Sequence, residues 1–236
     1  MESYVDKSKV SLRPVNKKLA KDMIEQYHYS GVMSACRFTL GVFYKSDNHK
    51  FFGRSVVTSM FTEDLIENKN VLELKRLFIH DGYGKNIESY VISQSFKWLK
   101  EHSPDIKVLI SYADPEQAHD GCIYQATNWI YQGCGSFQLM PTYSLRLNEE
   151  DDWMHSRNVY SKYGSNNIDK MKKAIGHDFW LKRETTKHRY IYFLGNKKQN
   201  RKFRKVLKHP SMNYPKNTEF IDEIIKVEVK DNKWKD

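Results

Sequence analysis

The chain has 236 residues, of which 39% are hydrophobic and 14% aromatic, which is enough apolar material for one sizeable core or two small ones. No apolar run approaches the roughly 18 residues that cross a bilayer, and the first ten residues hold no apolar stretch, so we expect neither a membrane protein nor a secreted one. Cys36, Cys122 and Cys134 form no C-x-x-C pair, which argues against a disulfide framework and a cysteine zinc site.

The formal net charge of +10 is concentrated in one C-terminal block. Residues 182–208 hold eleven Lys and Arg residues against one acid, Glu184, whereas the rest of the chain holds 28 basic and 28 acidic residues. Such a block neutralises phosphates. The alternative is a solvated face, but the neighbouring "HRYIYF" favours nucleic acid. In the densest stretch, "KKQNRKFRKVLK", the candidate contacts are Lys197, Lys198, Arg201, Lys202, Arg204 and Lys205.

In the first half of the chain, the pattern predicts strands interrupted by two helices. A strand at 9–15 is followed by a helix from the N-cap Asn16 to about Tyr27. "CRFTLGVFYK" and "KFFGRSVVTSM" predict strands paired around the turn "SDNH". Residues 70–81 predict a further strand, and a helix is expected from about 87 to 100.

The second half predicts the sheet's centre. The apolar run in 105–114 is typical of a strand covered on both faces. "GCIYQATNWIYQG" predicts a helix with Gly133 as its C-cap, and "FQLMPTYSLRLN" and "KHRYIYFLGN" predict late strands. We therefore expect an α/β or α+β fold with a mixed central sheet and helices on both faces.

As domain organisation, we expect one domain over 1–215. It includes a polar insertion near 149–180 and the basic segment 182–208. Residues 216–236 either pack as a short element or form a C-terminal tail.

Two strand-to-helix junctions, 79–88 and 112–123, are expected to form a ligand site. In "HDGYGKN", the backbone of Gly82, Gly84, Lys85 and Asn86 precedes a helix and is suited to an anion, with Ser89 adding a hydroxyl; an ordinary turn is the alternative.

The strand "LELKRLF" contains a cation among apolar residues. Alternation with a period of two places Leu72, Leu74, Arg76 and Phe78 on one face. Arg76 there either forms a buried salt bridge, to Asp114 or Glu73, or faces a ligand.

Polar, titratable groups gather in two further stretches. In "SYADPEQAHDG", Asp114 is a base, a metal ligand or a structural cap, and His119 follows it. Together with His28 they make a set suited to divalent iron. In "YHYS", His28 is a base or ligand and Tyr29 a hydrogen-bonding or stacking ring, unless both serve only to end a helix.

Taken together, "HYS", "ELxRL", "KNxES", "WLKE", "SxADPExxHxGxIYQAxNW" and "HRYIYF", from about residue 20 to about 215, resemble the Mom family of bacteriophage proteins. The resemblance implies a fold of the GNAT acetyltransferase type and conversion of adenine in DNA to N6-(carbamoylmethyl)adenine, which protects phage DNA from restriction. It implies that His28, Tyr29, Arg76, Ser89, Asp114 and Tyr124 are the residues needed for modification. It also implies a link to iron, for which His28, Tyr29 and Asp114 are the candidate ligands.

The donor stays open. The acetyltransferase pattern Q/R-x-x-G-x-G/A is replaced by "HDGYGKN", so acetyl-CoA or another donor is expected, and acyl transfer alone cannot join N6 to a CH₂ carbon. The resemblance further implies double-stranded DNA as partner, no membrane, and the cytoplasm of an infected bacterial host; whether the protein is a homodimer stays open.

Two alternatives remain. An acetyl-CoA-dependent N-acetyltransferase of a small amine or protein predicts coenzyme A binding and indifference to DNA. A non-catalytic DNA-binding protein of the same fold predicts binding that survives loss of His28 and Asp114.

Overall fold

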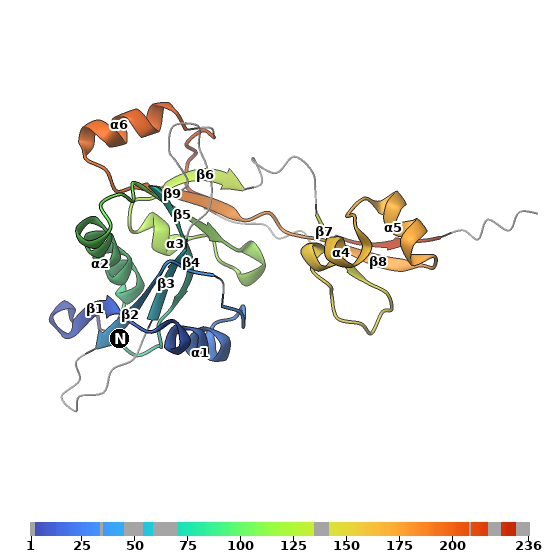
Figure 1. Ribbon diagram of the computed structural model, residues 1–236, viewed down its shortest axis with the longest axis horizontal. Helices are drawn as coiled ribbons and strands as arrows, with labels where there is room; N and C mark the ends of the chain where they lie inside the picture. The colour runs from blue at the N-terminus through green and yellow to red at the C-terminus, as the bar shows by residue number, and fades with distance from the viewer. Residues whose placement is uncertain are drawn as a thin grey trace, which may run out of the picture.

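The computed structural model describes residues 3–33, 35–44, 54–58 (backbone only), 70–134, 142–207, 209–216 and 223–229. A seven-stranded mixed sheet, ordered β1-β2-β3-β4-β5-β9-β6, forms the larger part (Figure 1). Its strands are β1 (Val10–Pro14), β2 (Phe38–Tyr44), β3 (Arg54–Thr58), β4 (Val71–Phe78), β5 (Val108–Ala113), β6 (Ile130–Cys134) and β9 (His188–Phe193). The helices beside it are η1 (Lys7–Lys9), α1 (Lys17–Tyr27), α2 (Ile87–His102), η3 (Pro115–Gln117), α3 (Cys122–Gln125) and α6 (Lys197–Lys205). Among the described strands of this sheet, β4 and β5 are parallel and the other pairs antiparallel.

Helices cover both faces of this sheet. On one face, Phe96 and Leu99 of α2 pack with Leu72 of β4. On the other, Phe203 of α6 packs with Val71, the next residue along β4. Because neighbouring strand residues point to opposite faces, the predicted α/β class with helices on both faces is confirmed.

The first helix begins and ends as its sequence predicts. The Asn16 side chain accepts the Lys18 N–H at 2.7 Å, and Ala20 and Ile24 are fully buried against the sheet. The last helical residue is Tyr27 and His28 is the C-cap. The predicted strands at 9–15, 70–81, 105–114 and 187–196 and the helix at 87–100 are also confirmed within a few residues.

The helix predicted over "GCIYQATNWIYQG" is wrong. Only one turn, α3, forms, and Asn128, with φ +59°, then reverses the chain. Residues 130–134 become β6, which pairs with β9, and Trp129 is buried in the core. Pairing with β9 and burial of Trp129 therefore override the helical pattern of this segment. Gly133 lies within strand β6 and does not cap a helix.

The prediction that Arg76 and Phe78 share a face with Leu72 and Leu74 is also wrong. Val56 and Val57 of β3 pair with Arg76 and Leu74, so β4 carries one extra residue, Lys75, as a β-bulge. Beyond the bulge the alternation shifts by one. Leu77 joins the cluster of Leu72 and Leu74, whereas Phe78 packs against α1 on the opposite face.

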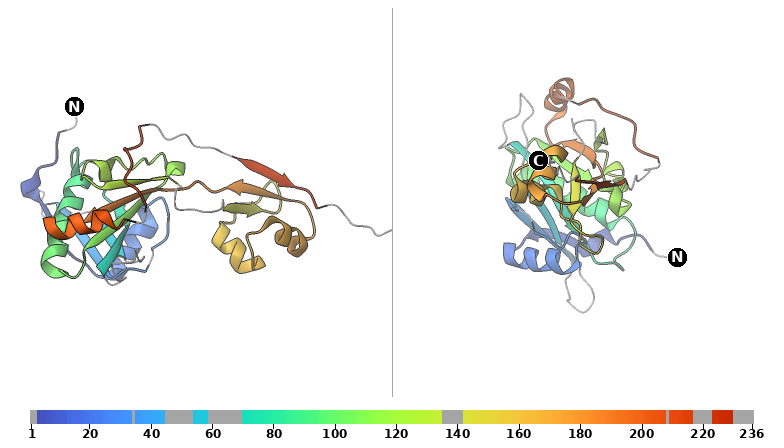
Figure 2. Two further views of the ribbon diagram at one scale, coloured as in Figure 1. Left: turned by 90° about the horizontal axis from the view of Figure 1, so that it is seen from above. Right: turned by 90° about the vertical axis from the view of Figure 1, so that its right-hand side faces the viewer.

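A second, three-stranded sheet, ordered β10-β8-β7, builds a separate small unit (Figure 2). We call it the small sheet unit; it comprises β7 (Tyr143–Arg146), α4 (Ser156–Tyr163), α5 (Ile168–Ile175), β8 (Phe179–Arg183) and β10 (Ile224–Val227). Its own core includes Leu145, Val159, Met171 and Phe179. The polar insertion expected at 149–180 thus lies inside a larger unit, and residues 224–227, from the expected tail, form its edge strand.

Parts of the predictions lie outside the described residues, namely the turn "SDNH" and residues 137–141 of the late strand. In the part of the chain that the structure describes, no helix is long and apolar enough to cross a membrane.

Candidate functional site

A cavity of about 490 Å³ lies where β4 and β5 diverge, a volume within the usual range for ligand sites. The ladder between these parallel strands runs from Val71–Val108 to Glu73–Ile110 and goes no further. Beyond it, the ends of β4 and β5 form two walls, and the residues after α1 and the segment 118–124 form the others. Both predicted junctions contribute to this lining.

Of the predicted catalytic residues, the cavity brings together three, His28, Tyr29 and Tyr124. Arg76, Ser89, Asp114 and the loop residues Gly82, Gly84, Lys85 and Asn86 are not among its lining residues.

His28 is a neutral imidazole with a defined tautomer. Its Nδ1 accepts the backbone N–H of Ser30 at 3.1 Å and lies 2.9 Å from the Ser30 hydroxyl. An accepting Nδ1 has no proton, so Nε2 bears it. Burial, and then the charges of Arg76 and His119, lower the pKa of His28 to about 4. At neutral pH, His28 therefore offers an N–H donor at Nε2, while its basic Nδ1 is engaged by Ser30.

Tyr29 supplies an exposed ring beside this histidine. Its exposed fraction is 56%. The ring centroid lies 4.3 Å from that of His28 and 5.6 Å, edge-on, from that of His119. An exposed ring held by two imidazoles at a cavity is suited to stacking on a planar ligand.

Tyr124 is buried in the cavity wall, and its hydroxyl points towards β4 and β5. The hydroxyls of Tyr124 and Ser111 are 2.7 Å apart, and Ser111 Oγ lies 2.8 Å from the carbonyl oxygen of Leu74. Because a carbonyl only accepts, Ser111 donates to it and Tyr124 donates to Ser111. Burial raises the pKa of Tyr124 to about 12, so the phenol is neutral. The pair bridges β4 and β5 where their ladder has ended.

Arg76 supports the segment that follows His28. Its Nε donates to the carbonyl of Val32 at 3.1 Å and its NH1 to that of Lys75 at 2.8 Å. Among the described residues, no ion pair joins Arg76 to Asp114, one of the two alternatives left open by the sequence. It is Lys75, the bulge residue, that lines the cavity.

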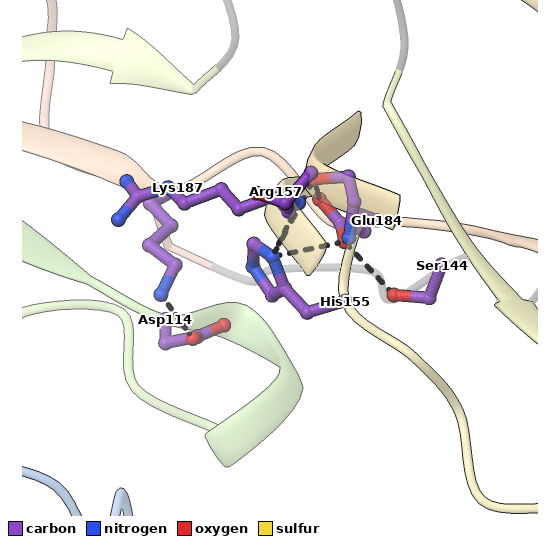
Figure 3. A network of polar contacts seen from close by, with 8 residues as sticks. Asp114, Ser144, His155, Arg157, Glu184 and Lys187 are labelled. Atoms are coloured by element: carbon purple, nitrogen blue, oxygen red, sulfur yellow. Dashed lines mark hydrogen bonds and ion pairs between the residues drawn. The ribbon is translucent and has the colours of Figure 1, made fainter. Parts of the chain in front are cut away.

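Asp114 ties the cavity loop to the connection between β8 and β9 (Figure 3). One carboxylate oxygen lies 2.8 Å from Lys187 Nζ, and the other accepts the Glu116 N–H at 3.2 Å. Glu116 in turn accepts the Thr185 hydroxyl at 2.7 Å. The loop that carries His119 into the cavity is thus fastened at two points.

The same connection is anchored to the small sheet unit by Glu184. Its carboxylate accepts the Ser144 hydroxyl at 2.8 Å and the N–H of Ser156, at the start of α4, at 2.7 Å (Figure 3). Burial raises the pKa of Glu184, but these hydrogen bonds and the nearby His155 outweigh it, so the net pKa lies below its usual value.

The glycine-containing loop before α2 lies against the N-terminal residues. The Lys85 N–H donates to the carbonyl of Ser3 at 2.9 Å, and a Cβ at Gly84, whose φ is +94°, would lie 2.8 Å from the same oxygen. The Lys85 amide is therefore engaged within the chain. Anion binding by Gly82, Gly84, Lys85 and Asn86 stays a prediction.

The six predicted phosphate contacts all lie exposed on α6. Asn196 and Gln199 form a reciprocal capping box at its start, and Phe203 anchors it to Phe193 of β9. Arg204 also lies over the ring of Phe193, 5.9 Å from its centroid. DNA binding by the six cations stays a prediction.

The predicted iron ligands do not converge. Among the described residues, no three His, Cys, Asp or Glu side chains are close enough together to hold one metal ion. His28 and Tyr29 lie at the cavity, whereas both oxygens of Asp114 are engaged elsewhere. These three residues do not fit as one metal site in this arrangement, and iron stays a prediction from the resemblance.

The cavity also has lining residues that the sequence did not single out, among them Lys75, Glu88, Tyr112 and Cys122. Glu88 and Cys122 lie at the two predicted junctions, which was a usable signal. Nothing in the pattern of β4 pointed to Lys75, because the bulge that places it depends on pairing with β3.

Comparisons with known proteins agree with the motifs. Residues 9–216 match the Mom protein family. The chain is 27% identical over 211 residues to the methylcarbamoylase Mom of Escherichia phage Mu. The alignment covers 81% of this chain and 80% of that protein. Its mixed α/β fold loosely resembles a spermidine N-acetyltransferase from Vibrio cholerae, with a TM-score of 0.46 and 12% identity over 82% of this chain and 98% of that one. Arabidopsis thaliana NAA60 has a TM-score of 0.43 and 10% identity over 79% and 99%. The chain belongs to the Mom protein family.

Proposed function

We propose that this protein converts adenine in DNA to N6-(carbamoylmethyl)adenine and so protects phage DNA from restriction in the cytoplasm of an infected bacterial host. The observation that carries the proposal is the cavity between β4 and β5. It gathers His28, Tyr29 and Tyr124, three of the residues that the sequence resemblance implies are needed for modification, around one space large enough for a purine and a small donor.

The adenine reaches this cavity by leaving the duplex stack, at a cost of a few kcal/mol. Tyr29 offsets part of that cost by stacking on the base, a contribution of roughly 1–3 kcal/mol. His28 donates its Nε2 proton to an acceptor on the base or donor, as its tautomer allows. The exposed cations of α6, which packs against the first residues of β4 and β5 and so lies away from the cavity, hold phosphates at a distance from the target base.

The reaction forms a bond between N6 and a CH₂ carbon. A bond from that carbon to its leaving group breaks, with the electron pair departing on the leaving group, and N6 loses a proton. His119 and Asp120, on the loop fastened by Asp114, are titratable groups of the cavity wall that can receive that proton. A donor that carries its leaving group on the CH₂ carbon of a carbamoylmethyl group satisfies this balance, whereas acetyl-CoA does not, because its thiolate leaves from the carbonyl carbon.

Restriction protection tests the proposal. Plasmid DNA from bacteria expressing the protein is digested with an enzyme whose site contains adenine, and we expect resistance. Tyr29→Ala is expected to lose most of it, whereas Tyr29→Phe, which keeps the ring, retains it. Complete digestion of plasmid from cells holding soluble, folded parent protein contradicts the proposal. Equal protection by Tyr29→Ala contradicts the stacking role.

A further inference from the structure

The small sheet unit separates its charges in space. Its four consecutive acids, at 149–152, lie between β7 and α4. The segment 156–175, which holds α4 and α5, instead contains five basic residues and a single acid, Asp169. The five are Arg157, Lys162, Lys170, Lys172 and Lys173. A segment that is nearly neutral in sequence therefore folds into a basic helical surface, which we call the α4–α5 surface.

Packing turns these cations outward, although Arg157 also lies near enough to Glu73 of β4 for its charge to favour the ionised form of that carboxyl, whose pKa burial raises. Val159 of α4 and Met171 of α5 are buried in the core of the small sheet unit, so the opposite sides of both helices face solvent. Four of the five cations are exposed and Lys172 is half-buried. Within the described part of the chain, none of the five forms a salt bridge with a carboxylate. Tyr160, 59% exposed on α4, adds a ring to the same region.

Seen from above, the α4–α5 surface and α6 lie towards the same side of the molecule, although α6 is at the top edge of Figure 1 and α4 and α5 are lower. In the left view of Figure 2, both lie below the long axis, α6 beside the larger sheet and α4 and α5 beside the smaller one. The strand β9 and the connection to β8 run between the two. A duplex lying along this side meets basic side chains at both ends.

We propose that the α4–α5 surface is a second contact for the phosphates of duplex DNA, separate from α6. The inference rests on the proposed function and deepens it, since it assigns the small sheet unit as the arm that holds DNA on the far side of the connection. Two weak contacts carried by one chain act together, so losing either weakens binding more than its own affinity suggests.

Anisotropy of a labelled duplex, measured over a series of salt concentrations, tests this without requiring any modification. Each phosphate contact contributes about −0.9 to the slope of log K against log salt. Lys170→Gln/Lys173→Gln is expected to reduce that slope by up to about 2 and to weaken binding at every salt concentration. The matched control is Lys97→Gln/Lys100→Gln, which removes two exposed charges from α2; its slope is expected to equal that of the parent.

Four outcomes overturn the inference, and the last of them also overturns the proposed function. An unchanged slope for Lys170→Gln/Lys173→Gln, with the parent binding DNA, refutes the second contact alone. An equal loss in the α2 control attributes the effect to total charge. If Lys170→Gln/Lys173→Gln weakens binding of RNA or of phosphatidylserine vesicles more than binding of duplex DNA, then RNA or an anionic membrane, and not DNA, is the partner of this surface. Absence of duplex binding by the parent removes DNA as substrate, and the proposed function fails with it.

Discussion

Acidification from pH 7 to pH 5 is expected to lower the free energy of unfolding by about 2 kcal/mol through His28 alone. The pKa of His28 falls from 6.5 to about 4 on folding. A histidine whose pKa is depressed stabilises the fold above its unfolded pKa, and that contribution is lost as the pH falls from 6.5 towards 4. Proton linkage with these two values gives a contribution of about 2 kcal/mol less at pH 5 than at pH 7.

Urea unfolding of the parent and of His28→Asn at both pH values measures this difference. Asn keeps an acceptor for the Ser30 N–H but does not titrate, and every other titrating group cancels between the two proteins. We expect the parent to lose about 2 kcal/mol more than the variant on acidification. Parallel losses would refute the conclusion that a neutral, desolvated His28 is built into the fold.

Three further tests concern the pair Asp114 and Lys187, the phenol of Tyr124, and the backbone at Gly121. If Asp114 acts only by fastening its loop, Asp114→Asn and Lys187→Gln lower DNA modification equally and the double variant is no worse; a far larger loss in Asp114→Asn would show a direct chemical role. Tyr124→Phe is expected to cost about 1 kcal/mol of stability through the bond to Ser111 and to retain modification, and abolished modification in a folded protein would contradict its role as a wall. Gly121→Ala, at φ +81° against an aromatic ring, is expected to lower unfolding free energy by at least about 2 kcal/mol, and an unchanged urea midpoint would exclude that crowding.

The parts of the fold that the sequence predicts well are those determined locally. Asn16 caps α1, the apolar stripe of that helix faces the sheet, and the helix stops one residue before His28. The continuous apolar run of β5 likewise reveals a strand covered on both faces. The cluster around His28 is predictable for this reason, since it lies where a recognisable helix ends.

The features that the sequence does not predict depend on pairing between distant segments. The bulge at Lys75 arises against β3, and no pattern within β4 shows that Arg76 points away from Leu74. Residues 130–134 form a strand because β9 pairs with them. Nothing in the sequence links Lys187 to Asp114, because the two lie far apart along the chain and meet only when the strands are assembled.

The proposed reaction is tested most directly by the nucleoside composition of DNA exposed to the protein. Plasmid from bacteria expressing the parent, Tyr29→Ala, or no protein is digested to nucleosides, and the deoxyadenosine pool is analysed by mass spectrometry. We expect a new deoxyadenosine species that carries a carbamoylmethyl group in place of one hydrogen. This species is expected to be abundant with the parent and greatly reduced with Tyr29→Ala. Deoxyadenosine carrying an acetyl group, or an unaltered pool with soluble, folded protein present, would contradict the proposed reaction.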